Sequence, residues 1–317
     1  MKKWSKRIAV VFVVSVLVWM AYVAWLQPPI LQGIVAYGIS YKEGKSLDVY
    51  YPKNRLSEKS PVVFFVHGGA WVVGRKEAIN MNRFNGAIAT LRDSGFTIIS
   101  PEYTLAGVNQ KAFPNCIDDV IDAINYCVDH AEELEIDTNR MGVFGESAGA
   151  HIALMIGYGM ENDSFPRCKP MDYVVDVYGP TQLEGVYKNP LVDSIEVWVD
   201  KLPKSLQGKV DITRQIIGFN PLEDTLRSQR IMDFYSPLLY VNRDSPPTLI
   251  IQGNQDLIVP PSQSYMLDSA LAHHGVFHKV LYLKGVNHAF FGATSEQKSK
   301  IQEVLSQFIL SQYKNED

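Results

Sequence analysis

Three residues of the kind that acyl-transfer chemistry uses lie in three separate segments of the chain. Ser147 lies in GESAG, Asp256 in IQGNQDLIVP and His288 in LKGVNHAFFG. A serine hydroxyl is a poor nucleophile at neutral pH, so it needs a base, and the base needs an acid that orients it. The chain order Ser, Asp, His is one of the orders in which such a triad occurs. We therefore predict Ser147 as the nucleophile, His288 as the base and Asp256 as the orienting acid.

The sequence around Ser147 favours a catalytic serine over an ordinary helix cap. GESAG (145–149) follows the apolar run MGVF and precedes the apolar stretch AHIALMIG. A Gly-x-Ser-x-Gly pattern is weak by itself, but this strand–turn–helix setting is typical of a nucleophile elbow. Gly145 and Gly149 would be needed because side chains beside Ser147 would clash in so tight a turn. The helix N-terminus would also stabilise negative charge that develops at Ser147.

The segment VHGGAW (66–71) follows the apolar run PVVFF and has the composition of an oxyanion-binding loop. Acyl transfer places negative charge on the carbonyl oxygen, and losing one N–H donor to that oxygen costs about 2.7–4 kcal/mol. We predict the backbone N–H groups of Gly68, Gly69 and Ala148 as the donors. A plain Gly-Gly turn is the alternative, which the triad disfavours.

Three neighbours of these motifs are predicted to line the substrate pocket. Ala70 and Trp71 follow the two glycines, and Glu146 precedes Ser147. Glu146 lacks the spacing to orient His288, so we expect it to belong to a polar network beside the nucleophile.

The remaining histidines are expected to be structural. His67 has no co-ligands at a metal-binding spacing, so we predict that it holds its loop. His151 lies one turn beyond Ser147 and is expected beneath the elbow. His273, His274 and His278 lie at a predicted helix end and strand start, as surface or capping residues. No C-x-x-C spacing occurs, and the proposed chemistry requires neither a metal nor an organic cofactor.

The elements that would position these residues alternate between strand and helix. Continuous apolar runs such as PVVFFV and TLIIQ indicate strands that are covered on both faces of a mostly parallel sheet. Because ligands bind at the carboxyl ends of such strands, the three triad segments would meet at one edge. Strands are predicted at 34–39, 47–51, 61–66, 96–100, 141–144, 173–178, 248–252 and 279–283, and helices at 80–93, 114–133, 147–160, 261–274 and 296–312. The fold class is therefore α/β, doubly wound.

The segment at about 180–245 has no clear strand and is predicted to be a helical cap inserted into the sheet domain, with short helices at 190–200 and 211–218.

The N-terminus is predicted to be a membrane anchor. Four basic residues precede Ile8–Leu26, which are 19 residues without a charge. As a helix this run would cover about 28 Å, close to the ~30 Å hydrocarbon core. The positive-inside rule then places the N-terminus in the cytoplasm and the catalytic domain (28–317) outside, with 1–27 as basic tip and anchor. A cleaved signal peptide, giving a secreted protein, and a soluble protein are the alternatives.

Composition adds two limits. Apolar residues make up 46% of the 317 residues, enough for a sizeable core, and the net charge of −4 gives no electrostatic case for binding nucleic acid.

Cys116 and Cys127 lie too far apart on one predicted helix to form a disulfide, whereas Cys168 could pair with either. The sequence carries no signal for an oligomeric state.

These motifs resemble the α/β-hydrolase superfamily, and within it the hormone-sensitive-lipase-like and carboxylesterase-like bacterial esterases. The resemblance rests on HGGAW, GESAG, the segment SPLLYVNRDSPPTLIIQGNQDLIVP and the segment PEYTLAGVNQKAFPNCIDDV. It implies an α/β-hydrolase fold with an eight-stranded sheet and a serine hydrolase that cleaves a small-molecule ester. Two departures are Ala70, where the family often has a third glycine, and VNHAFF. Ala70 is expected to narrow the acyl pocket.

The resemblance leaves the substrate open. Aromatic residues near the glycines and in the cap (Trp71, Tyr187, Trp198 and Phe219) suit a small acyl or aryl ester more than a charged substrate. An amidase or peptidase and a polysaccharide deacetylase are alternatives that would use the same triad. A non-catalytic recognition domain is the alternative from another class, although such domains usually lack a triad member.

Overall fold

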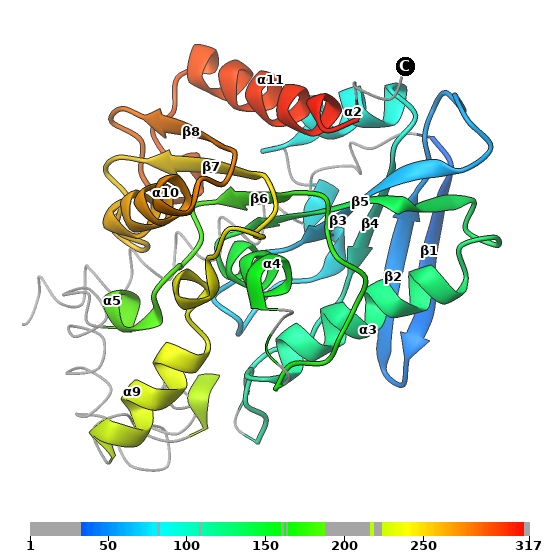
Figure 1. The fold of residues 1–317 in the computed structure, drawn as a ribbon. Helices are drawn as coiled ribbons and strands as arrows, with labels where there is room; N and C mark the ends of the chain where they lie inside the picture. Colours follow the sequence, from blue (N-terminus) through cyan, green and yellow to red (C-terminus); the bar gives the residue numbers. More distant parts are fainter. Residues whose placement is uncertain are drawn as a thin grey trace, which may run out of the picture.

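A single eight-stranded sheet forms the centre of the molecule (Figure 1). The computed structural model describes residues 33–80, 83–107, 109–159, 162, 164–187, 216–218 and 224–313. The strands, in the order β1-β2-β4-β3-β5-β6-β7-β8 across the sheet, are β1 (Val35–Lys42), β2 (Lys45–Tyr50), β4 (Thr97–Pro101), β3 (Ser60–Val66), β5 (Ile136–Glu146), β6 (Val174–Val177), β7 (Thr248–Gly253) and β8 (His278–Leu283). Strand β2 is antiparallel to β1 and β4, and the other pairs are parallel. The prediction of eight strands in a mostly parallel sheet is confirmed.

Helices cover both faces of the sheet, which explains the continuous apolar runs of the central strands. Every residue of β3, β4, β6 and β7 is buried, whereas the edge strands β1 and β8 are partly exposed. Alternate residues of β3 enter two different cores, as the two-residue period of a strand requires. Val62, Phe64 and Val66 pack on one side, and Val63 and Phe65 on the other.

One core lies under α3, α4 and α10, and the other under α2 and α11 (Figure 1). The helices are α2 (Asn85–Asp93), α3 (Asn115–Asp129), α4 (Ala148–Tyr158), α10 (Ser262–His274) and α11 (Ser295–Ser311). The prediction of a helix at 80–93 was wrong at its start, because Lys76–Asn80 form a separate 3₁₀ helix, η1. The other four helices lie where they were predicted, except that α3 ends at Asp129 and not at 133.

The chain between β6 and β7 contains helical segments in its described part. These are α5 (Leu183–Tyr187), α9 (Thr225–Phe234) and the 3₁₀ helix η3 (Pro237–Tyr240), which contacts α4 and α10. Helix α9 was not predicted; it begins where the side chain of Asp224 accepts a hydrogen bond from Arg227 N at 2.9 Å. The helix predicted at 190–200, most of the one at 211–218, and the aromatic residues Trp198 and Phe219 lie outside the described residues.

The predicted anchor at 8–26 also lies outside the described residues. Within the described ranges, no helix is both long and apolar enough to cross a membrane. Cys116, Cys127 and Cys168 are all free thiols, so the disulfide considered for Cys168 is absent.

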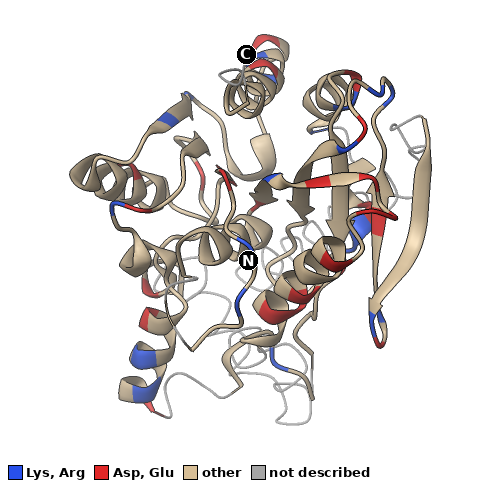
Figure 2. Cartoon of the chain, turned by 45° about the vertical axis from the view of Figure 1, so that its right-hand side comes forward, with Lys and Arg blue, Asp and Glu red and all other residues tan. Residues whose placement is uncertain are grey.

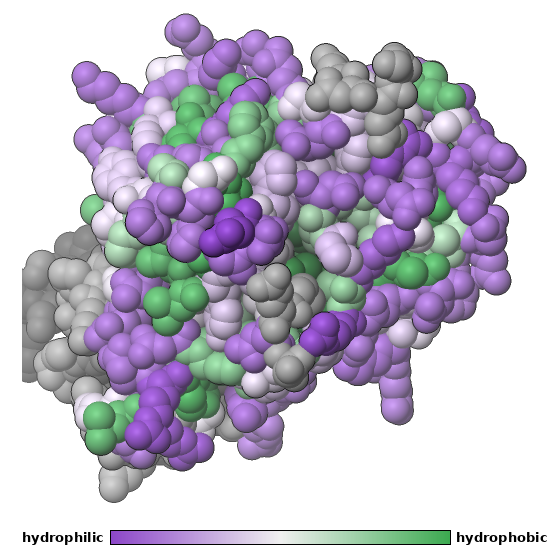
Figure 3. All heavy atoms as spheres, in the orientation of Figure 1, coloured by the Kyte–Doolittle hydropathy of each residue, from purple (hydrophilic) through white to green (hydrophobic). Residues whose placement is uncertain are grey.

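The surface mixes charged and apolar groups. Acidic residues, red in Figure 2, lie along α3, and two of them, Asp119 and Asp122, pair with Lys42 of β1 at 2.9 and 2.7 Å. The β1–β2 hairpin is thereby tied to α3 at the edge of the sheet. In Figure 3, hydrophobic patches lie among hydrophilic side chains on the face seen in Figure 1.

Candidate active site

Ser147 lies in a sharp turn between β5 and α4. Its backbone has φ 52° and ψ −120°, a left-handed conformation that costs free energy for any residue with a Cβ. The turn is fixed by hydrogen bonds from Ser147 N to Val177 O at 2.9 Å and from His151 N to Ser147 O at 3.1 Å. A Cβ on Gly145 would lie 2.2 Å from Gly149 O, and one on Gly149 would lie 2.1 Å from Val66 O. Only glycine fits at either position, as the elbow motif requires.

The three predicted triad residues lie within hydrogen-bonding distance of one another. Ser147 Oγ is 3.0 Å from His288 Nε2, and His288 Nδ1 is 2.7 Å from Asp256 Oδ2. Ser147 follows β5, Asp256 follows β7, and His288 begins the 3₁₀ helix η4 (His288–Phe290) after β8. Because Nδ1 donates to the carboxylate, Nε2 is left as the acceptor for the serine proton. This is the geometry of a serine whose base is held by an acid.

The carboxylate of Asp256 is buried and fully hydrogen-bonded. Its Oδ1 accepts from the N–H groups of Ile258 and Val259, both at 2.9 Å, and Gln252 Nε2 donates to Oδ2 at 3.1 Å. Three donors of this kind fix the orientation of the carboxylate. These contacts fix the position of Asp256, so that its Oδ2 can accept a hydrogen bond from His288.

Asn287 joins the loops that carry Asp256 and His288. Its Oδ1 accepts from Leu257 N at 3.1 Å and from His288 N at 2.7 Å. Neither Asn287 nor Gln252 was predicted from the sequence as a site residue. Both residues lie close in sequence to a triad residue, which was the only signal for them. Polar side chains are common in turns, so this signal did not distinguish them from other polar residues.

The loop after β3 places Gly68 beside the nucleophile, and Gly69 follows it in a turn. A Cβ on Gly68 would lie 3.4 Å from Ser147 Cβ, and Gly69 has φ 122° in a turn where its carbonyl accepts from Val72 N and Val73 N, both at 3.0 Å. In the part of the chain that the structure describes, the N–H groups of Gly68, Gly69 and Ala148 donate no hydrogen bond. Buried or half-buried N–H groups without a partner beside a serine can serve as an oxyanion hole.

The chain matches the BD-FAE family model over residues 47–271, more than half of its length. The chain belongs to the BD-FAE family. The structure is similar to that of an arylesterase, with a TM-score of 0.68 and 20% sequence identity, over 93% of this chain and 90% of the other. With the sheet described for this chain, this similarity shows the α/β-hydrolase fold.

Curated relatives of this BD-FAE chain include two bacterial proteins. Esterase LipC of Mycobacterium tuberculosis is 25% identical over 224 residues, which are 69% of this chain and 50% of LipC. Ethyl acetate hydrolase of Pseudomonas putida is 25% identical over 259 residues, which are 80% of this chain and 74% of that protein. The BD-FAE chain thus spans about half the length of LipC and about three quarters of the second relative.

His67 holds the glycine loop of the BD-FAE chain. Its buried ring stacks on Tyr103 with centroids 4.2 Å apart, and its Nδ1 donates to Gly68 O at 2.8 Å. Burial lowers the pKa of His67, which favours the neutral ring. Within the described ranges there is no group of three or more His, Cys, Asp or Glu side chains that could hold a metal ion. These contacts agree with the predicted loop-holding role.

Ala70 and Trp71 lie close in sequence but differ in environment. Both have left-handed backbones, with φ 51° and 59°. Ala70 is exposed, whereas Trp71 is buried with its ring 5.2 Å from that of His151 and 5.6 Å from that of Phe113. His151 donates from Nε2 to Tyr235 O at 2.7 Å, and burial lowers its pKa to about 4. His151 is therefore a neutral core residue, as expected for a structural histidine.

Glu146 belongs to a buried polar network, of which Glu146 alone was predicted from the sequence. Its carboxylate accepts from Tyr178 Oη at 2.6 Å and from Arg83 Nη2 at 3.0 Å. Glu146 raises the pKa of Arg83, which keeps the guanidinium charged. The ring of Tyr178 also lies 4.7 Å from that of His288. The network thus connects the backbone before Ser147 to the histidine. Arg83 and Tyr178 were missed because they lie in segments distant from the elbow.

Four exposed apolar side chains lie close in sequence to the site residues. Val73 follows the glycine loop, Leu257 and Ile258 follow Asp256, and Phe291 follows His288 by three residues. Exposed apolar side chains that flank site residues in the sequence are candidates for the wall of a binding mouth.

Proposed function

We propose that this chain is a serine hydrolase that cleaves carboxylic esters of small molecules, with short-chain acyl or aryl groups, through an acyl-enzyme on Ser147. The observation that carries the proposal is the 3.0 Å contact between Ser147 Oγ and His288 Nε2, with Asp256 2.7 Å from the other ring nitrogen. Ser147 Oγ attacks the ester carbonyl while His288 Nε2 takes the hydroxyl proton. His288 then gives that proton to the leaving alcohol, and Asp256 stabilises the imidazolium in between.

Water completes the cycle. His288 removes a proton from a water molecule, which attacks the acyl-enzyme and releases the acid and free Ser147. In both steps the N–H groups of Gly68, Gly69 and Ala148 are proposed to stabilise the oxyanion. We propose that the substrate lies near Ala70, Trp71 and Glu146. Ala70 would contact it from the exposed side of the loop, and Glu146 would act through the buried network.

Two observations favour esters over amides. The relatives compared here are named as an esterase and as an ethyl acetate hydrolase, and the apolar side chains near the triad suit an acyl or aryl group. An amidase, peptidase or polysaccharide deacetylase would use the same triad, so the leaving group has to be tested directly.

The test compares p-nitrophenyl acetate with acetyl p-nitroanilide, which differ only in the bond cleaved. We expect turnover of the ester, no comparable turnover of the anilide, and loss of ester turnover in Ser147→Ala. Ser57→Ala, on the exposed loop before β3, is the control and should be fully active. A larger kcat/KM for the anilide would favour the amidase, and undiminished turnover by Ser147→Ala would remove the nucleophile assignment.

We also propose that residues 8–26 anchor the protein in a membrane with the catalytic domain outside the cytoplasm, and that about 180–245 form a cap. The charge-free run behind four basic residues supports the anchor, and α5, α9 and η3 between β6 and β7 support the cap. N-terminal sequencing of protein extracted from membranes tests the anchor. A mature start near Gln27 would instead indicate a cleaved signal and secretion.

A further inference from the structure

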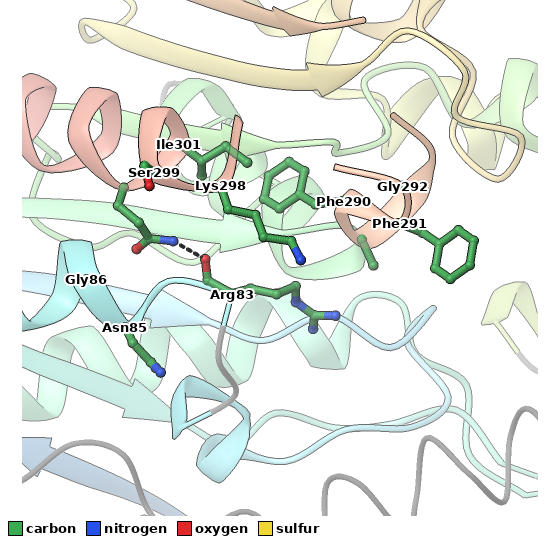
Figure 4. A pocket seen from close by; sticks show the side chains of 11 residues that line it. Arg83, Asn85, Gly86, Phe290, Phe291, Gly292, Lys298, Ser299 and Ile301 are labelled. Atoms are coloured by element: carbon green, nitrogen blue, oxygen red, sulfur yellow. Dashed lines mark hydrogen bonds between the residues drawn. The ribbon is translucent and has the colours of Figure 1, made fainter. Parts of the chain in front are cut away.

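A pocket of about 580 Å³ lies beside the loop that follows His288 (Figure 4). Three segments distant in sequence form its wall: 83–86 at the start of α2, 289–292 after the histidine, and 298–302 in α11. Gln302 joins two of these segments, because its Nε2 donates to Arg83 O and its Oε1 accepts from Ala87 N at 2.9 Å. The volume is in the range of sites for small molecules.

The charged side chains in the wall of this pocket are both cationic. Arg83 and Lys298 extend toward one another in Figure 4, and none of the described residues that line the pocket is Asp or Glu. No described carboxylate lies within ion-pair distance of Lys298, whereas Lys300, two residues further along α11, pairs with Glu303 at 3.0 Å. Arg83 is already paired with Glu146, whereas the ammonium group of Lys298 has no acidic partner among the described residues. The uncompensated charge of Lys298 beside the guanidinium therefore favours an anion in the space between them.

Aromatic groups form the remaining side of the pocket. Phe290 is buried and packs against Tyr178 with ring centroids 5.0 Å apart, while Phe291 is 77% exposed. Ile301 adds an apolar side chain from α11. An anion that is bound here would therefore have apolar surface beside its charge, which suits an organic acid better than an inorganic ion. The planar guanidinium of Arg83 matches a carboxylate group.

We propose that this pocket binds a small organic carboxylate with an aromatic or branched apolar body, and that Arg83 couples its occupancy to the nucleophile elbow. Arg83 lines the pocket and also holds Glu146, which directly precedes Ser147. A bound carboxylate competes with Glu146 for Arg83. Weakening that contact loosens the buried network that joins the elbow to Tyr178 and His288. Occupancy should therefore lower the turnover number.

Binding is tested by titrating benzoate into the Ser147→Ala protein in a calorimeter. This variant separates binding from catalysis, so the result does not depend on whether the chain hydrolyses esters. We expect saturable binding that Lys298→Gln, made in the same background, weakens by about tenfold, the effect of removing one charge-assisted hydrogen bond. Lys300→Gln, on the same helix but outside the pocket, should bind benzoate as before.

Coupling is tested with the active protein and p-nitrophenyl acetate. Saturating benzoate should lower kcat by at least about twofold, an effect expected of coupling through a packed network, and Lys298→Gln should abolish this response at unchanged basal activity. Equal benzoate affinity with and without Lys298 would overturn the site, because benzoate would then be bound elsewhere. If the protein bound inorganic phosphate but not benzoate, the proposal that the ligand is an organic carboxylate would be overturned. A kcat that saturating benzoate leaves unchanged would overturn the coupling.

Discussion

Ser147 depends on backbone positions where a side chain would not fit. A Cβ on Gly145 or Gly149 would overlap neighbouring backbone atoms, and Gly69 forms the turn that follows Gly68 beside the nucleophile. The glycine motifs could be predicted from the sequence because this requirement is local. The partners Asn287, Gln252, Arg83 and Tyr178 could not, because each acts through a contact that only the folded chain creates.

Gly69→Ala should damage catalysis without a triad residue being changed. Gly69 has φ 122°, and a Cβ there would lie 1.8 Å from Val73 O, so the loop must shift and its N–H groups move away from the oxyanion. We expect kcat for p-nitrophenyl acetate to fall by about 10²–10³, the effect of losing one oxyanion donor. Gly107→Ala is the matched control, because a Cβ at Gly107 meets no atom within 4 Å. Equal activity of the two variants would contradict the role of this loop.

The strands could be predicted more securely than the helices. Continuous apolar runs arise because β3, β4, β6 and β7 are covered on both faces, and these runs are visible in the sequence. Helix α9 escaped prediction because only Ser228 and Met232 of its residues are buried, which leaves little apolar periodicity. The only sequence signal for the start of α9 was its capping residue, Asp224.

Strand β6 carries a buried acid that should make folding sensitive to pH. Asp176 is fully buried; its Oδ1 accepts from Gly179 N at 2.8 Å, and its Oδ2 has no partner among the described residues. Burial raises the pKa of Asp176 from 3.8 to about 7. The folded state therefore holds this proton more tightly than the unfolded state does. Its stabilising contribution is complete below about pH 4 and is lost as the pH rises to about 7.

Asp176→Asn should remove this dependence, since an amide does not ionise. Urea unfolding at pH 5 and pH 8 should show a smaller loss of unfolding free energy in the variant than in the unchanged protein. The difference has an upper limit of about 3 kcal/mol, since about two pH units of the shift lie between pH 5 and the folded pKa of about 7. Asp244→Asn, at an exposed position before β7, should keep the original dependence. An unchanged dependence in Asp176→Asn would mean that Asp176 is ionised in the folded state.

At the scale of the whole molecule, the chain enters the sheet at the edge opposite the triad. Val35 at the start of β1 pairs with Tyr50, and Tyr50 pairs with Ile98 near the start of β4. The triad residues follow the carboxyl ends of the parallel strands. The segment from Leu26 to Ile34 is short and reaches at most about 28 Å. The anchor that we propose would therefore direct the active site away from the bilayer.

This orientation can be measured on protein reconstituted into vesicles, with a fluorophore attached at one edge of the sheet or at the other. Cys168 is first replaced by Ser, and the label is placed at Ile34→Cys or at Leu257→Cys, both exposed positions. A quencher carried by the lipids should quench the label at 34 and leave the label at 257 bright. Equal quenching at both positions would contradict the orientation, and no quenching at either would contradict the anchor.

The acyl-enzyme on Ser147 is the central claim, and rapid acid quenching during turnover of p-nitrophenyl butyrate tests it most directly. Peptide mass spectrometry of the quenched protein should locate a butyryl group on Ser147. The Asp256→Asn variant should form this adduct far more slowly, since an acid of this kind contributes about 10⁴ to turnover in a serine protease. A butyryl group on another residue, or turnover without any adduct, would contradict the account.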